Sequence, residues 1–200
     1  ALAILFSANA FSQTTFPTNG PVNNNHNYYA FTNAKLFVDY QTVIDKATLL
    51  IKDGMIVQAG TSVVLPKGTV VMDMKGKSIY PSFIDPYTTY GMPEIKKGAP
   101  WNPSPQYETA TKGAYNWNEA IKPETDAVKL FVTDDKSAEE MRRLGFGSVL
   151  SFNKDVIARG SAVFVSLGKE KENKVVIQDK VAAMYSFNKG TSGQEYPSSQ

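Results

Sequence analysis

The chain has 200 residues, of which 21 are Lys or Arg and 19 are Asp or Glu, and it contains no cysteine. This length supports one domain, or one domain and part of another, and the 42% hydrophobic content is enough for a core. The near-neutral charge, with its scattered basic residues, argues against a nucleic-acid or anionic-membrane surface, because both require a concentrated positive field. Without cysteine, the sequence offers no disulfide, no thiolate nucleophile and no Cys-ligated zinc.

Residues 1–12 are an apolar run followed by small residues, with alanine at positions 8 and 10. This pattern is typical of the second half of a secretory signal peptide, and a buried N-terminal strand is the alternative interpretation. Residues 13–27 are polar and aperiodic, which favours an exposed linker. We therefore expect an exported protein, periplasmic or extracellular, whose sequence begins here within a signal-peptide remnant. No segment approaches the ~18 apolar residues of a membrane span.

Residues 28–80 are predicted to form a small β layer without helices. Aromatic and β-branched residues bounded by turn residues predict strands. These predicted strands cover residues 28–38, 47–51, 55–58 and 70–74. Asp53-Gly54 predicts a tight hairpin turn between the second strand and the third.

From residue 77 the pattern changes. Residues 78–85 are predicted to be a short buried run, and residues 91–125 form a long loop rich in Pro, Gly and aromatic residues. Loops of this length are usually functional or ordered against a partner surface. The loop's aromatic residues either pin it onto the domain beneath, which we favour, or form a platform for a sugar or peptide. They are Trp101, Tyr107, Tyr115 and Trp117.

The last part of the chain has an α/β pattern. Residues 135–144 predict an amphipathic helix, with Ser137 as the N-cap, Glu140 completing a capping box, and Gly145 ending the helix. Glu139 and Arg143 are spaced for an ion pair on the wet face of this helix. Buried strands are predicted at residues 148–152, 162–167 and 174–178.

Three segments in order, residues 33–37, 50–60 and 71–85, resemble the opening of the amidohydrolase superfamily in its imidazolonepropionase and dihydroorotase-like branch. The resemblance implies an α/β fold: a composite β-sandwich portion at residues 28–80, then an incomplete (β/α)8 TIM-barrel start at residues 81–200. A complete barrel takes about 250 residues, so we expect the N-terminal part of a longer protein. Three later segments are similar to large exported amidohydrolase-family proteins of Bacteroidetes-type bacteria. These are residues 126–131, 144–150 and 159–162.

In that superfamily a His-x-His pair follows the barrel entrance and binds the catalytic metal, but here the two positions hold Tyr87 and Thr89. Such sites use neutral imidazole ligands to activate a bound water, so we predict no metal site and assign no catalytic residue in this part of the protein. Asp85 keeps the acidic residue before the pair, and we expect it to form hydrogen bonds at a strand end. The single histidine, His26, is expected to be a solvated linker residue, with metal binding as the alternative.

Three functions remain open. The first is a longer hydrolase that acts on carbon–nitrogen bonds of a small-molecule or peptide-like substrate, with zinc or another divalent metal held by ligands beyond this chain and the C-terminal part needed to complete the fold. The second is a non-catalytic amidohydrolase-like scaffold or interaction module. The third is a secreted glycan-binding domain that uses the aromatic loop.

Overall fold

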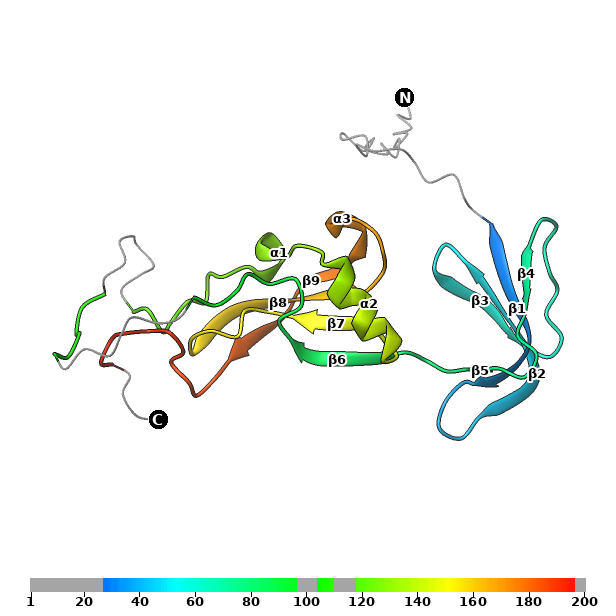
Figure 1. Cartoon of the computed structure of the whole chain (residues 1–200), viewed down its shortest axis with the longest axis horizontal. Helices are drawn as coiled ribbons and strands as arrows, with labels where there is room; N and C mark the ends of the chain where they lie inside the picture. Colours follow the sequence, from blue (N-terminus) through cyan, green and yellow to red (C-terminus); the bar gives the residue numbers. More distant parts are fainter. Residues whose placement is uncertain (1–26, 97–103, 110–117, 197–200) are drawn as a thin grey trace, which may run out of the picture. The chain divides into compact units, whose positions relative to one another are not determined.

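Two mixed β-sheets with few helices make up most of the computed structural model, which describes residues 27–96, 104–109 and 118–196 (Figure 1). The first sheet belongs to a unit that ends at Tyr80, and the second belongs to a unit that begins at Pro81. Each unit has its own sheet and is described by itself. No helix within the described residues is long and apolar enough to cross a membrane.

The first unit is a five-stranded sheet in the order β3-β2-β1-β4, with β5 also pairing with β1. Strands β1 and β2 are antiparallel, as are β2 and β3, whereas β4 and β5 run parallel to β1. The strands are β1 (Tyr28–Phe37), β2 (Val43–Lys52), β3 (Met55–Gly60), β4 (Val70–Asp73) and β5 (Ser78–Ile79). The described part of this unit contains no helix, as predicted.

The hairpin between β2 and β3 is confirmed. Asp53 and Gly54 both have positive φ, 49° and 76°, which is the geometry that a two-residue hairpin turn requires. The predicted start of β2 at residue 47 was too late, because an earlier turn returns the chain to the sheet sooner. In that turn the Asp39 carboxylate accepts hydrogen bonds from the backbone N–H groups of Gln41 at 2.8 Å and Thr42 at 2.7 Å.

The buried residues of the first unit are few, half of them are alanine, and they lie on β1 and β2. They are Ala30, Ala34, Leu36, Ala47, Leu49 and Leu50. Apolar side chains on β3 and β4 remain exposed, among them Met55 at 71% and Ile56 at 66%. The residues described here form one layer, and the second layer of the β-sandwich that the resemblance implies is not found among them.

The second unit is a four-stranded sheet in the order β6-β7-β8-β9. Strands β6 and β7 are parallel, whereas β7, β8 and β9 are antiparallel neighbours. The strands are β6 (Phe83–Thr88), β7 (Phe146–Ser151), β8 (Ala158–Ser166) and β9 (Val176–Tyr185); the helices are α1 (Ala127–Leu130), α2 (Asp135–Arg143) and α3 (Glu172–Val175). The core contains buried aliphatic side chains of β7 and β8 together with Tyr90, Phe131 and Ala138.

The α/β character of this unit is limited to one crossover, the connection from β6 to the parallel strand β7, which contains α1 and α2. The chain then continues with antiparallel strands, where a (β/α)8 barrel would continue with helices and parallel strands. The described residues form no closed barrel. The chain is therefore more β-rich than the predicted α/β fold with a barrel start.

Helix α2 is confirmed, but its predicted N-cap was wrong. Asp134 is the cap: it has extended backbone dihedrals, and its carboxylate accepts hydrogen bonds from the N–H groups of Lys136 and Ser137. Ser137 lies inside the first turn, where its hydroxyl donates to the same carboxylate. Gly145 follows the helix with φ 95°, as the prediction of a helix-ending glycine requires.

Two further predictions need correction. The run at residues 78–85 is not buried: Tyr80, Phe83 and Ile84 are 62%, 65% and 57% exposed. Phe83 and Ile84 lie on β6, an edge strand that lacks a neighbour on one side in the described residues. The strand predicted at residues 174–178 begins instead as the last residues of α3, and β9 starts at Val176.

Candidate functional site

The position that the resemblance assigns to the first metal-ligating histidine is occupied by Tyr87, near the end of β6. Its side chain is half exposed, at 53%. The ring packs edge-on against Phe152, with the ring centroids 5.1 Å apart, and Phe152 is fully buried. The phenol is therefore fixed on one side by the core and open to solvent on the other.

Two cationic side chains converge on Tyr87: Lys154, from the segment between β7 and β8, and Arg159, from the start of β8. Arg159, the second residue of β8, is only 6% exposed, and its Nη1 donates a hydrogen bond to the Tyr87 hydroxyl at 3.1 Å. Its Nε donates to the carbonyl of Val156 at 3.1 Å. Lys154 donates from Nζ to the backbone carbonyl of Tyr87 at 2.8 Å and lies 4.1 Å from the centroid of its ring.

This arrangement makes the end of β6 electropositive. The hydrogen bond from Arg159 lowers the pKa of the Tyr87 phenol below its ordinary value; burial acts to raise it, and the charges of Arg159 and Lys154 lower it further. A guanidinium and an ammonium beside this phenol oppose the approach of a divalent cation. The same two groups favour an anion.

The other sequence-predicted residues of the barrel entrance do not join Tyr87 in a ligand set. Thr89 is exposed, and its backbone carbonyl accepts a hydrogen bond from Met92 N. Asp85 accepts a hydrogen bond from the backbone N–H of Tyr87 at 2.9 Å, which agrees with the expected role at a strand end. In the part of the chain that the structure describes, no three His, Cys, Asp or Glu side chains lie close enough together to hold a metal ion.

Several predicted candidates fall outside the described residues, namely His26, Trp101, Tyr115 and Trp117. The remaining member of the aromatic loop, Tyr107, is 73% exposed, and its backbone carbonyl accepts a hydrogen bond from Gln194 Nε2 at 3.4 Å. The predicted ion pair on α2 is confirmed, with 2.7 Å between Arg143 Nη2 and Glu139 Oε1.

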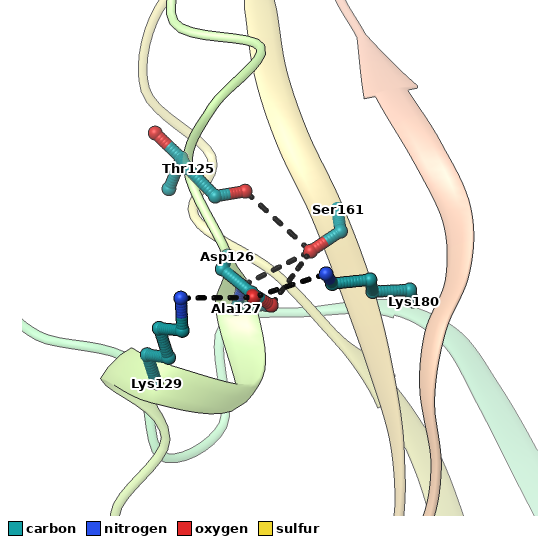
Figure 2. Close-up of polar contacts among 6 residues, drawn as sticks. All are labelled: Thr125, Asp126, Ala127, Lys129, Ser161 and Lys180. Carbon is teal, nitrogen blue, oxygen red and sulfur yellow. Dashed lines mark hydrogen bonds and ion pairs between the residues drawn. The ribbon is translucent and has the colours of Figure 1, made fainter.

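A second polar cluster joins α1 to β8 and β9, and Figure 2 shows its side chains pointing toward one another. The Asp126 carboxylate lies 3.5 Å from Lys180 Nζ and 3.6 Å from Lys129 Nζ. Ser161 Oγ donates to this carboxylate at 3.3 Å and accepts from the N–H of Ala127 at 3.2 Å. Burial acts to raise the pKa of Asp126, but the Lys180 charge and the hydrogen bonds from Lys180 and Ser161 outweigh it, so that the pKa is lowered.

The backbone around this cluster is unusual on both strands. Gly160 has φ 80°, and the ladder between β8 and β9 is irregular on either side of Ser161. Lys180 has φ 47° at one of these irregularities, a conformation that costs a residue with a side chain about 1–2 kcal/mol. A pocket of about 200 Å³ opens beside the cluster, lined mainly by apolar atoms, with Lys180 and Ser161 among its walls. Since the polar atoms of this cluster satisfy one another, we assign it a structural role that fixes α1 on the sheet.

Sequence reasoning missed the residues that surround Tyr87. Lys154 belongs to no predicted element or similar segment, and Arg159 was included only in the similar segment at residues 159–162, without a role. They meet Tyr87 because β6 pairs with β7 and β7 pairs with β8, which brings together residues far apart in the chain.

No family model matches the chain, and no curated protein matches it. Among solved structures, the chain is similar to an amidohydrolase from Thermotoga maritima MSB8, with a TM-score of 0.55 and 16% sequence identity. The match covers 82% of this chain and 40% of that one, so this chain spans less than half of that structure's length. At this identity the likeness concerns the fold alone, and it supports an amidohydrolase-like fold.

Proposed function

We propose that the chain is the N-terminal part of an exported amidohydrolase-superfamily protein, and that the longer protein hydrolyses carbon–nitrogen bonds with a metal held by residues outside this part. The amidohydrolase-like fold supports the lineage, because the similar structure is itself an amidohydrolase. The contacts of Tyr87 support the second half of the proposal. A residue that accepts a hydrogen bond from a buried guanidinium and lies beneath an ammonium is an unsuitable ligand for a divalent cation.

A second function is favoured by the same observation. If no metal is bound at the end of β6, this unit is a non-catalytic amidohydrolase-like scaffold, and any catalysis belongs to another part of the protein. In both cases the 200-residue chain hydrolyses nothing by itself. The two functions differ only in whether the longer protein is an enzyme.

Metal content and activity of two purified proteins distinguish these functions. The 200-residue chain and the longer protein would be analysed for zinc by mass spectrometry and assayed on dipeptides and cyclic amides, before and after treatment with a chelator. We expect no stoichiometric metal in the short chain, and both metal and chelator-sensitive amide hydrolysis in the longer protein. A longer protein with neither would support the scaffold, and stoichiometric zinc in the short chain would contradict both functions.

A further inference from the structure

The two cations that converge on Tyr87 have no acidic partner among the described residues. None of the ion pairs within the described residues includes Lys154 or Arg159. The carboxylate adjacent in sequence, Asp155, is already engaged: it accepts hydrogen bonds from the backbone N–H of Thr191 at 2.8 Å and from its hydroxyl at 2.6 Å. Within the described residues, two positive charges therefore lie beside one phenol without an ion-paired carboxylate.

Because the Arg159 guanidinium is buried, its lack of an acidic partner among the residues that the structure describes is energetically unfavourable. Arg159 is 6% exposed, and a charge removed from water is normally paired, because desolvation of an unpaired ion is expensive. Its hydrogen bonds within the described part of the chain use Nε and Nη1. Nη2 is not among the buried atoms that lack a partner, so it remains open to solvent and to a ligand. The two hydrogen-bond acceptors of Arg159 are a backbone carbonyl, that of Val156, and a phenol oxygen, that of Tyr87, and neither is a carboxylate.

We propose that the end of β6 is a binding site for a small carboxylate, held between Lys154 and Arg159 beside the Tyr87 ring. A guanidinium presents a planar set of donors that matches a carboxylate, and the ammonium adds a second charge. The ring of Tyr87, open to solvent on one side, offers an apolar surface next to the charged groups. The site does not depend on whether the longer protein is a hydrolase.

Ligand-observed NMR with benzoate tests the proposal on the 200-residue chain. Saturation transfer to benzoate would be measured at neutral pH over concentrations of about 0.1–20 mM, since a ligand of this size binding through one charged group is expected near the millimolar range. Benzamide is the matched neutral ligand. We expect saturable transfer to benzoate, none to benzamide, and weaker binding at higher salt.

Charge-matched variants locate the site. Lys154→Gln should weaken benzoate binding at least about tenfold, because one charge-assisted hydrogen bond is lost. Lys129→Gln removes the same charge from an exposed lysine elsewhere in the unit and should change binding less than about twofold. Tyr87→Phe keeps both cations and should retain binding to benzoate.

Three results would overturn the proposal: equal transfer to benzamide, equal losses in the Lys154 and Lys129 variants, or no benzoate binding by a folded wild-type chain. Arg159→Gln is a further test, expected to abolish binding. If that buried substitution unfolds the chain, the Lys154 comparison still decides. None of these readouts involves metal or hydrolysis, so they remain separate from the tests of the proposed function.

Discussion

Replacing Gly160 by alanine should strongly destabilise the second unit. A Cβ at this position would overlap the carbonyl oxygen of Thr125 and lie 2.7 Å from its carbonyl carbon, and Gly160 has φ 80°. The positive φ costs a residue with a side chain about 1–2 kcal/mol, and overpacking against backbone adds about 1–3 kcal/mol. We therefore expect a loss of about 2–5 kcal/mol, a large share of the ~5–15 kcal/mol that stabilises a typical domain.

The clash also has a definite structural consequence. The Thr125 carbonyl accepts a hydrogen bond from the backbone N–H of Ser161 at 2.8 Å, and α1 begins two residues later. Moving this carbonyl away from β8 breaks that bond and displaces the Asp126 carboxylate from Ser161 (Figure 2). The Gly160→Ala substitution should therefore disturb α1 as well as β8.

Urea unfolding followed by circular dichroism measures the loss, with a midpoint shift on the order of 1–2 M for a slope typical of a small domain. The control is Gly145→Ala in the same unit, where φ is 95° but the nearest atom to a new Cβ is a ring carbon of Phe83 at 3.3 Å. That variant carries the conformational cost without a backbone clash, so we expect about 1–2 kcal/mol. The reasoning is refuted if Gly160→Ala is no more destabilising than Gly145→Ala.

Three further experiments, with four variants, test the remaining assignments. Asp126→Asn should lower the thermal midpoint at pH 7 and make the stability of the unit less sensitive to acid. The reason is that the folded chain lowers the pKa of the Asp126 carboxyl. The resulting stability is fully present above the ordinary pKa of about 3.9 and is lost as the pH falls through the lowered value. A wild-type-like acid unfolding curve would contradict this role. Asp134→Ala should lower the thermal midpoint by roughly 4 °C through loss of the helix cap, whereas Ser137→Ala should have a smaller effect; the reverse order would restore the sequence-based assignment. The double variant Tyr87→His/Thr89→His should still bind no stoichiometric zinc, as measured by mass spectrometry, because the two neighbouring cations remain. Tight zinc binding would show that the ligands alone were missing.

The features that the sequence predicts well are those determined by a few neighbouring residues. The turn at Asp53-Gly54 depends on two residues that accept positive φ, and the end of α2 at Gly145 depends on one, so neither needs knowledge of distant contacts. The N-cap residue of α2 was harder to predict, because both Asp134 and Ser137 are good capping residues and the hydrophobic pattern of the helix does not distinguish them.

Which side chains are buried, and which residues surround Tyr87, depend on how the strands pair. Strand pairing cannot be read from the sequence. An apolar run such as residues 78–85 is usually buried, but here Phe83 and Ile84 lie exposed on the edge strand β6. Arg159 reaches Tyr87 across β7, and no spacing rule connects two residues so far apart in the chain. The replacement of histidine by tyrosine was visible in the sequence, whereas the cations that accompany it were not.

The parallel pairing of β6 and β7 allows the length of the chain between these two strands to vary. Thr88 and Phe146 are joined by a long connection that contains α1 and α2, whereas β7, β8 and β9 follow one another with shorter connections. The entropy of closing a flexible loop grows only logarithmically with its length, so doubling such a connection costs about 0.6 kcal/mol. An insertion between β6 and α1 that leaves buried residues such as Tyr90 and Ala120 in place should therefore cost little in chain entropy and preserve the sheet.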